Sequence, residues 1–479
     1  MTQSRRVSGS SNPAGLQALE SALERDFDRL QYPKGDWLKP RRSSSGEVVL
    51  DVLVVGAGQG GLAIASALRR ERVESVLLVD RNPLDRAGPW LSFARMRTLR
   101  TPKHVTGPDL GLPNLTIQAW YEAQHGEGAW EELGLIPKET WAAYLSWYRR
   151  FLKLPVLPDT TVEALTWNEE EAAFEVGLRG SDGTAQTRFA RRVVLATGIE
   201  GSGDWCVPSF IKDALPRTCY AHTRWDIDFD ALAGKRVAVL GAGASAFDNA
   251  SVALEHGAAS VDLFFRRPKL VDINPYRWAE FVGFLKHHGD LPDADRWKFI
   301  HKIVEMGQLP PADTLARARD NAGFTLHPGA PWTQVQPAGK GLAVTTPKGT
   351  SEFDFAIIGT GFVTNLKLRP ELAGFAEHIA TWADRYTPPA EQAHADLLRH
   401  PYLGPAFQFT ERESGAAPYL RHLYNFTFGG LVSMGMGGSS ISGMKYAVPR
   451  IVAGITASLF LEDKDVHFNT LQAFDTKEF

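Results

Sequence analysis

Cysteine is scarce in this chain, which has only two among 479 residues, Cys206 and Cys219. Two cysteines exclude a disulfide framework, and without a Cys-x-x-Cys pair or a matching histidine cluster they predict no metal site. The first residues are basic and polar with no apolar stretch behind them, so a secretory signal is not expected. These absences favour a reducing, cytoplasmic location.

An excess of one charge is also missing. The chain has 52 Lys and Arg against 55 Asp and Glu, and a formal net charge of -3. This balance gives no reason to expect a nucleic acid or an anionic membrane as partner. The apolar run at 451–461 is too short to span a bilayer. The composition is that of a soluble globular protein, and its length predicts about three domain-sized units.

The most informative segment reads DVLVVGAGQGGLAIA, at residues 51–65. Gly56, Gly58 and Gly61 form Gly-x-Gly-x-x-Gly between a strand pattern and a helix pattern. The first glycine permits a tight turn, the second lets a pyrophosphate approach the backbone, and the third lets helix and strand pack closely. The helix N-terminus then offers free N–H groups to the phosphates. This arrangement predicts a dinucleotide site.

The next strand pattern, SVLLVD, ends in Asp80. A carboxylate at this place can accept hydrogen bonds from the ribose of an adenosine. Arg81, which follows directly, is expected to line the same site. An acid suits the unphosphorylated adenosine of FAD.

A second glycine phrase, RVAVLGAGASAFDNA, occupies residues 236–250. It carries Gly241 and Gly243, with Ala246 in the third place, a substitution that the dinucleotide fingerprint permits. Ser245, at the start of the predicted helix, is expected to lie beside the phosphates. One chain therefore contains two predicted dinucleotide sites.

The strand pattern after the second phrase ends in Arg266 and Arg267 instead of an acid. A planar guanidinium can bind a 2′-phosphate with paired hydrogen bonds, whereas a carboxylate would repel it. The second site is therefore predicted to prefer NADPH over NADH, with a plain solvated strand end as the alternative. With FAD in the first site, the chain is predicted to pass a hydride from nicotinamide to flavin.

Two strand patterns end in Thr-Gly, VVLATG at 193–198 and DFAIIGTGF at 354–362, which includes Gly361. They are expected where the chain leaves the FAD domain and later returns to it. The predicted fold is α/β, with two Rossmann-like domains and the NADPH domain inserted into the FAD domain. The expected bounds are 1–47 for an extension with an amphipathic helix, 48–225 and 351–479 for the two FAD parts, and 226–350 for the NADPH domain, with a helical insertion at about 274–323.

With both fingerprints and both exits in this order, residues 48–450 resemble the class B flavoprotein monooxygenases. This group holds flavin-containing monooxygenases, Baeyer–Villiger monooxygenases and N-hydroxylases. Trp90 falls where the family has its Gly-x-Trp near the flavin, and LRTPKHV, with Thr101, resembles a run of the flavin-containing monooxygenases. His222, in AHTRWD, resembles the histidine of the family's linker fingerprint, where it could hold the hinge between domains or simply pack.

The chain also departs from the family's patterns. The asparagine expected after Thr101 is missing, and Pro216 and Thr218 replace the Phe and Gly of the linker fingerprint. Trp225 comes one place earlier than in Baeyer–Villiger enzymes. The subgroup therefore stays open.

The resemblance implies that NADPH reduces FAD and that oxygen adds at flavin C4a. The resulting (hydro)peroxyflavin would pass one oxygen atom to a small organic substrate, expected at nitrogen or sulfur, with ketone oxygenation as the alternative. Lys103 and His104, just downstream of the flavin loop, could supply charge or a proton, unless they are an ordinary exposed pair. The small residues at 435–440, including Gly437, lead into a helix whose start is expected to approach the flavin ring.

Two other functions remain open from the sequence. A two-dinucleotide flavoprotein could reduce a quinone or a partner protein, although a disulfide reductase is excluded because residues 62–110 contain no cysteine. A non-enzymatic redox sensor could bind both nucleotides and signal through its N-terminal helix. A homodimer is expected only from base rates.

Overall fold

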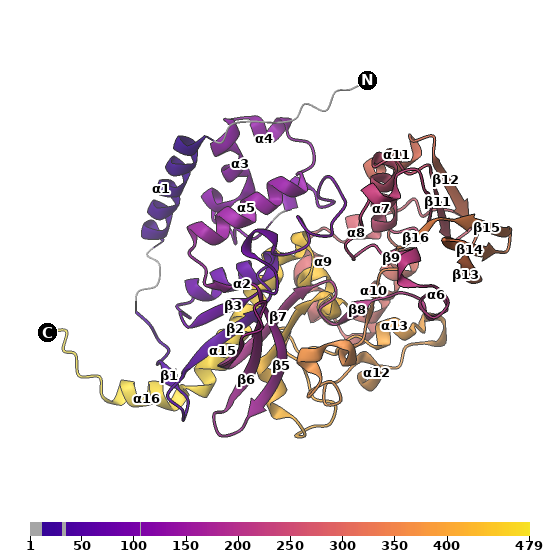
Figure 1. Cartoon of the computed structure of the whole chain (residues 1–479). Helices are drawn as coiled ribbons and strands as arrows, with labels where there is room; N and C mark the ends of the chain where they lie inside the picture. The colour runs from indigo at the N-terminus through magenta and orange to yellow at the C-terminus, as the bar shows by residue number, and fades with distance from the viewer. Residues whose placement is uncertain (1–11, 31–34, 106) are drawn as a thin grey trace.

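The chain folds into two α/β units, each built around its own sheet (Figure 1). This computed structural model describes residues 12–30, 35–105 and 107–479. The larger sheet has eight strands in the order β4-β3-β2-β7-β6-β5, with β1 beside β2 and β18 beside β7. Its strands are β1 (Arg41–Arg42), β2 (Val48–Val55), β3 (Val76–Val79), β4 (Val156–Leu157), β5 (Thr160–Asn168), β6 (Ala173–Gly180), β7 (Ala185–Gly198) and β18 (Leu423–Thr427).

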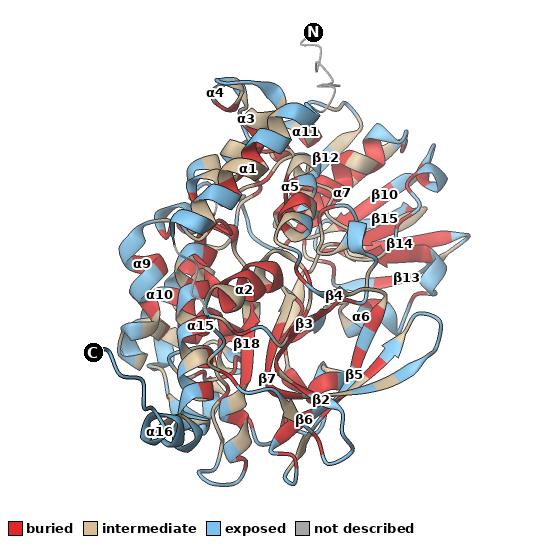
Figure 2. Cartoon of the chain, turned by 90° about the vertical axis from the view of Figure 1, so that its left-hand side faces the viewer, coloured by how far each residue is buried: buried red, intermediate tan, exposed pale blue. Residues whose placement is uncertain are grey.

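The middle of the larger sheet is buried. In β2, the side chains of Val52, Leu53 and Val54 have no exposed surface, and β2 runs parallel to both β3 and β7. Parallel strands covered on both faces have continuous apolar sequences. Figure 2 shows buried residues concentrated in β7, β18 and α2 (Gln59–Arg70). The strands predicted before the first glycine phrase and before Asp80 are confirmed as β2 and β3.

The second sheet is parallel throughout, in the order β12-β11-β10-β16-β9. All five strands come between β7 and β18 in the chain, so the second unit is inserted into the first, as predicted. Strands β9 and β16 lie outside residues 226–350, so this sheet extends beyond the expected range at both ends. The strands are β9 (Tyr220–His222), β10 (Arg236–Leu240), β11 (Ser260–Phe265), β12 (Phe324–Pro328) and β16 (Phe355–Ile358).

Two small antiparallel sheets accompany the two large ones, one at the junctions between the units and one within the second unit. One pairs β8 (Gly203–Trp205) with β17 (Phe362–Thr364), which join the two units on the way out and on the way back. The other consists of β13 (Gln334–Ala338), β14 (Gly341–Thr346) and β15 (Gly349–Phe353).

The predicted N-terminal helix is confirmed as α1 (Pro13–Arg29). It packs against α3 (Ile117–His125), and Leu23 on its inner face is fully buried. The indole Nε1 of Trp147 donates a hydrogen bond to Glu20 Oε1 at 2.9 Å. The helix therefore packs on the main body.

The expected helical insertion is also present, between β11 and β12. Helix α9 packs against α15, and α10 against α14, so the insertion covers the returning part of the first unit. Trp297 on α10 is buried against Trp382, with ring centroids 5.9 Å apart. The insertion has α8 (Pro275–Trp278), α9 (Val282–His287), α10 (Asp293–Met306) and α11 (Ala312–Arg319), and other helices include α4 (Ala129–Glu132), α5 (Lys138–Phe151), α6 (Ser209–Lys212), α7 (Ala244–Glu255), α12 (Trp382–Arg385), α13 (Ala395–Leu398), α14 (Leu431–Met434), α15 (Ile441–Glu462) and α16 (Lys464–Gln472).

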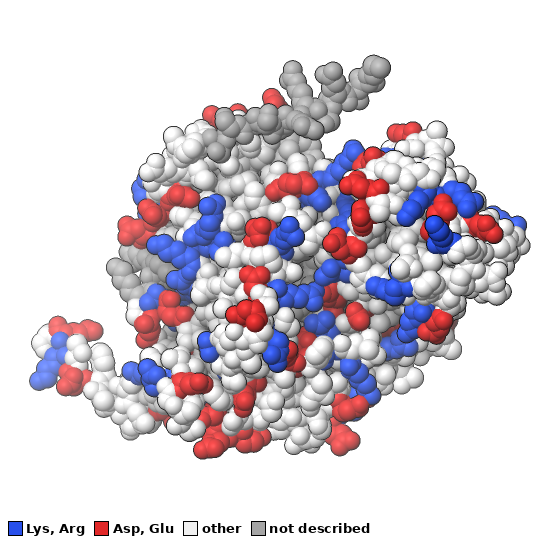
Figure 3. Space-filling model, in the orientation of Figure 1, with Lys and Arg blue, Asp and Glu red and all other residues white. Residues whose placement is uncertain are grey.

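Helix α15 is longer than the apolar run at 451–461 suggested. Its 22 residues are long and apolar enough, by length and composition, to cross a membrane. In the fold, one side of α15 packs against α2, with Ile451 and Ile455 fully buried. On the face in Figure 3, Lys and Arg are interspersed with Asp and Glu, as the near-zero net charge leads one to expect.

Candidate functional site

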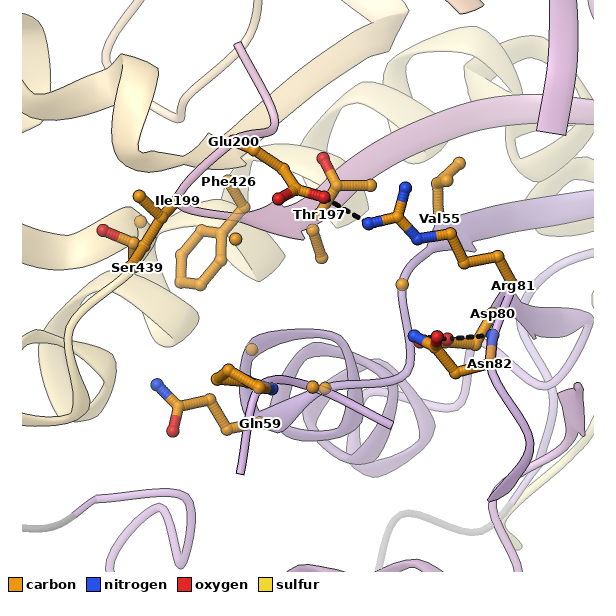
Figure 4. Close-up of a pocket in the computed structure, with 18 of the residues that line it drawn as sticks. Val55, Gln59, Asp80, Arg81, Asn82, Thr197, Ile199, Glu200, Phe426 and Ser439 are labelled. Carbon is orange, nitrogen blue, oxygen red and sulfur yellow. Dashed lines mark hydrogen bonds and ion pairs between the residues drawn. The ribbon is translucent and has the colours of Figure 1, made fainter. Parts of the chain in front are cut away.

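A cavity opens where the carboxyl ends of β2, β3 and β7 meet (Figure 4). Ligands of open α/β sheets bind at this edge because the loops there leave a crevice. The returning part of the first unit closes the cavity with Phe426 of β18 and the segment 437–440. The cavity is therefore built from both parts of the first unit.

The first glycine phrase forms one wall of this cavity. Gly56 has φ +105°, and a Cβ there would lie 2.5 Å from the carbonyl oxygen of Ala196. A Cβ on Gly61 would collide with the carbonyl oxygen of Gly56. Gly58 is followed directly by the first turn of α2. Gly56 and Gly61 thus have the steric roles that the sequence predicts, and the approach of a pyrophosphate at Gly58 stays a prediction.

Asp80 lines the cavity and also links two of the segments that form it. Its Oδ2 accepts a hydrogen bond from the backbone N–H of Ala57, inside the glycine loop, at 2.8 Å. Its Oδ1 accepts from the backbone N–H and the Nδ2 of Asn82 at 2.9 and 3.1 Å. The carboxylate therefore fixes the glycine loop to the end of β3.

A cluster around Glu200 forms the wall nearest the second unit. Glu200 pairs with Arg81, as the dashed line in Figure 4 shows, and also accepts hydrogen bonds from Trp205 Nε1 and, at 3.2 Å, from Arg224 Nε. Burial raises the pKa of Glu200, but Arg81 and Arg224 outweigh it and leave this pKa below its usual value. The Arg224 guanidinium lies 4.0 Å from the ring centroid of Phe93.

The cavity fits the FAD that the sequence predicts. Two buried polar atoms, Trp90 Nε1 and Thr197 Oγ1, have no hydrogen-bond partner among the described residues, and both residues line the cavity. Gly437 lies at the rim, and Ser440 caps α15 by accepting from the N–H of Gly443 at 3.0 Å. The start of α15 thus faces the cavity, as predicted for the segment at 435–440. When bound, FAD would supply the redox and oxygen chemistry at this site.

The second glycine phrase has the matching geometry for a second dinucleotide. Gly241 has φ +127°, and a Cβ there would collide with the carbonyl oxygen of Gly359. A Cβ on Gly243 would meet open space, so a phosphate can approach. Ser245 lies exposed in the first turn of α7. These residues fit the predicted NADPH.

The two arginines after β11 differ in their surroundings. Arg267 donates from Nη1 to the carbonyl oxygen of Met306 at 3.0 Å and from Nη2 to that of Glu305 at 3.2 Å, so it caps the end of α10. Arg266 is exposed and forms no hydrogen bond or ion pair within the described ranges. Of the pair predicted to bind a 2′-phosphate, Arg266 is the one whose guanidinium is available.

The three predicted catalytic residues do not line the cavity in the described structure. Lys103 donates from Nζ to the carbonyl oxygen of Leu133 at 2.9 Å and to that of Trp130, which points to a structural role. His104 is exposed. The Nδ1 of His222 accepts from the backbone N–H of Arg224 at 3.1 Å. Burial lowers the pKa of His222 to about 4, so the ring is neutral and positions the Arg224 backbone.

Two other predicted cofactor residues, Gly361 and Thr101, are not among the described residues that line the cavity. Gly361 has φ +77°, and its carbonyl oxygen accepts from the N–H of Cys206 at 2.9 Å. Thr101 is half-buried and follows Arg100. Cofactor contacts for both remain predictions.

An interdomain latch joins residues 88–100, called the flavin loop because they include Trp90, to the second unit. The latch is made of Arg97, Arg100, Asp248, Glu255 and Arg317. Arg100 pairs with the buried Asp248 of α7 at 2.9 Å, and Arg97 pairs with Glu255 at 2.6 Å. Arg317 of α11 binds both oxygens of Glu255, at 2.7 and 2.6 Å. The latch holds the second unit against the loop that follows Trp90.

Comparison with known proteins identifies the family. An FAD-dependent urate hydroxylase from Xanthomonas campestris pv. campestris is 44% identical over 464 residues, which cover 97% of each chain. The chain belongs to the class B flavoprotein monooxygenases. A family model for L-lysine 6-monooxygenase/L-ornithine 5-monooxygenase matches residues 131–282 of this monooxygenase, and an FAD-NAD(P)-binding model matches residues 53–200.

Partial relatives and solved structures extend the comparison. A Baeyer-Villiger monooxygenase from Streptomyces coelicolor is 30% identical over 203 residues, or 41% of this chain and 34% of that protein. An ornithine hydroxylase from Pseudomonas aeruginosa has a TM-score of 0.67 at 15% identity and covers 85% of this chain and 99% of its own. An ornithine N-hydroxylase from Kutzneria sp. 744 has a TM-score of 0.66 at 16% identity and covers 86% and 99%. The structural likenesses show the shared fold.

The predictions of fold, cofactors and reaction class are thereby confirmed. This monooxygenase uses FAD and NADPH and inserts one oxygen atom into a small organic substrate. Sequence reasoning missed the cluster of Glu200, Trp205 and Arg224. A signal for it existed, because Glu200 comes two residues after the Thr-Gly exit and Arg224 comes two residues after His222.

Proposed function

We propose that this monooxygenase hydroxylates urate. The observation that carries the proposal is the 44% identity to the FAD-dependent urate hydroxylase along almost the full length of both chains. Urate is a planar, electron-rich nitrogen heterocycle that is an anion near neutral pH, and such a nucleophile suits attack on dioxygen that a reduced flavin has activated. Urate contains nitrogen, and oxygen insertion at a nitrogen or sulfur atom, as the sequence analysis expects, stays a prediction for it.

The wall around Arg224 supplies a matching surface for a planar anion. The rings of Phe93 and Trp205 meet edge to face, with centroids 5.7 Å apart, and Arg224 lies over Phe93. A guanidinium binds planar anions through paired hydrogen bonds and stacking. We place urate in the cavity against this wall, on the side nearest the second unit, with these side chains excluding water.

Steady-state kinetics of the FAD-loaded enzyme tests the substrate. Urate should accelerate NADPH oxidation and be consumed in step with it, whereas ornithine, lysine and a cyclic ketone should not. Arg224→Ala should raise the KM for urate about tenfold or more, the cost of one charge-assisted hydrogen bond, and Arg224→Lys should recover part of the loss. A wild-type enzyme indifferent to urate would refute the proposal.

N-hydroxylation of a primary amine is the second candidate, because the lysine and ornithine monooxygenase model matches residues 131–282. Acceleration by an amine with formation of a hydroxylamine would favour it over urate. Ketone oxygenation has weaker support, since the Baeyer-Villiger relative aligns with only 41% of the chain.

We also propose that the enzyme works in the cytoplasm, as a homodimer, and without nucleic acid or membrane partners. The two free cysteines, Cys206 and Cys219, and the mixed surface charges support the location and the absence of such partners. Fractionation of the native host and light scattering of the holoenzyme test these points.

A further inference from the structure

A pair of charged residues at the edge of the FAD cavity has no role in the account so far. Arg369 and Glu371 flank Pro370 in the first turn of a short 3-10 helix, Pro370–Leu372. This turn follows β17 and packs against β5. Both residues line the cavity, together with Thr161 of β5. The returning part of the first unit thus places a carboxylate beside the carboxyl end of β3.

The carboxylate of Glu371 is buried, and within the described residues only one of its two oxygens accepts hydrogen bonds. Its side chain is 4% exposed, and Arg369 donates to its Oε1 from Nε at 2.9 Å and from Nη2 at 2.7 Å. Both bonds go to the same oxygen, and within the described residues Oε2 forms no hydrogen bond. Because Glu371 lines the cavity and an ionised carboxylate oxygen can accept further hydrogen bonds, Oε2 is suited to a donor on a ligand there.

The direction of the dinucleotide identifies which part of the ligand reaches Glu371. The pyrophosphate lies on the glycine loop, and the acid at the end of the next strand, Asp80, marks the adenosine ribose. Beyond that acid, the cavity is lined by Asn82, by Thr160, Thr161 and Val162 of β5, and by Glu371. The adenine base therefore extends toward β5 and Glu371.

We propose that Oε2 of Glu371 accepts a hydrogen bond from the exocyclic amine of the FAD adenine, with Arg369 as the residue that positions the carboxylate. The exocyclic amine is the only hydrogen-bond donor on the base edge of adenine, and an ionised carboxylate only accepts. The pair therefore recognises the adenine base, whereas Asp80 binds the ribose and holds the glycine loop in place. This role concerns the cofactor and is independent of urate.

Competition between FAD and flavin hypoxanthine dinucleotide, which carries a carbonyl in place of the amine, tests the proposal. Flavin-free protein is reconstituted with an equal mixture, and mass spectrometry gives the ratio of the two bound dinucleotides. The wild type should favour FAD by about tenfold or more, the value of one hydrogen bond to a charged group. In Glu371→Gln this preference should fall close to one, because an amide can donate to the carbonyl as well as accept.

Glu163→Gln is the matched control, because Glu163 is an exposed glutamate of β5, the strand against which the turn with Glu371 packs, and it is paired with Arg179. It should keep the wild-type ratio. The ratio is measured only on protein that has bound a dinucleotide, so partial misfolding of a variant does not distort it, and Glu371→Asp serves if the glutamine variant fails to fold. An unchanged ratio in the position-371 variant, or a wild type that discriminates only against a deoxyribose analogue of FAD, would overturn the proposal.

Discussion

Gly437 of the returning chain lines the cavity and packs against α15. A Cβ there would lie 2.5 Å from the Cβ of Ala447 and 3.2 Å from the Cζ of Phe407. Gly437→Val should therefore push the segment at 437–440 toward the flavin and lower FAD retention, measured as flavin absorbance per protein. Gly134→Val is the control, because a Cβ at Gly134 meets no atom within 4 Å. Full flavin content in the Gly437 variant would show that this rim does not hold the cofactor.

Single variants of the two arginines after β11 should affect different properties, one the choice of nicotinamide cofactor and the other stability. Arg266→Ala should lower the preference for NADPH over NADH by about tenfold or more, since it removes a charged partner of the 2′-phosphate. Arg267→Ala should leave this preference nearly unchanged but lower the melting temperature, because Arg267 binds the carbonyls at the end of α10. The ratio of kcat/KM for NADPH to kcat/KM for NADH measures this preference. If Arg267→Ala lowers the ratio and Arg266→Ala does not, the 2′-phosphate contact belongs to Arg267.

Among the elements, the interdomain latch connects the flavin loop with α7 and α11. Its central carboxylate, Asp248, has a side chain only 3% exposed and faces Arg100 and Arg317. We expect Arg100→Ala to loosen the second unit, so that more NADPH is oxidised per molecule of product formed. Arg179→Ala removes an exposed pair on β6 and is the control. If both variants form the same amount of product per NADPH oxidised, the interdomain latch has no role in coupling NADPH oxidation to product formation.

The sequence predicted the strands and helices that belong to the two glycine motifs. The strands before the glycine phrases and the helices after them were predictable because their spacing and burial are local properties. Partnerships between distant segments were not. Glu200 meets Arg224, 24 residues further along the chain, and Glu371 lines the cavity beside β2 and β3 only because the chain returns to the first unit after β17. Lys103 likewise finds its carbonyl partners, Trp130 and Leu133, much later in the chain, and its part in the chemistry stays a prediction.

For the whole molecule, buried histidines make stability depend on pH. Burial lowers the pKa of His288 and His400 to about 4 and that of His422 to about 3. Their ordinary value is 6.5, so between pH 6.5 and 4 the unfolded chain binds protons that the folded protein does not. Their stabilising contribution is therefore complete above pH 6.5 and is lost as the pH falls toward 4, by about 1 kcal/mol per pH unit for each histidine.

Urea unfolding of the holoenzyme at pH 7 and pH 5 measures this loss. His400→Gln should lower stability at pH 7 but show a smaller drop from pH 7 to pH 5 than the wild type, since one titrating group is gone. His104→Gln, at an exposed position, should retain the wild-type drop. Identical pH dependence in all three proteins would mean that His400 does not titrate on unfolding.

A single-turnover experiment tests the central claim, that the cavity and the second unit together make a urate-oxidising monooxygenase. The holoenzyme is reduced with one equivalent of NADPH without oxygen, then mixed with urate and ¹⁸O-labelled dioxygen, and the product is analysed by mass spectrometry. We predict one product molecule per flavin, carrying one labelled oxygen atom, with little hydrogen peroxide. Reoxidation of the flavin with stoichiometric peroxide and unchanged urate would contradict the account.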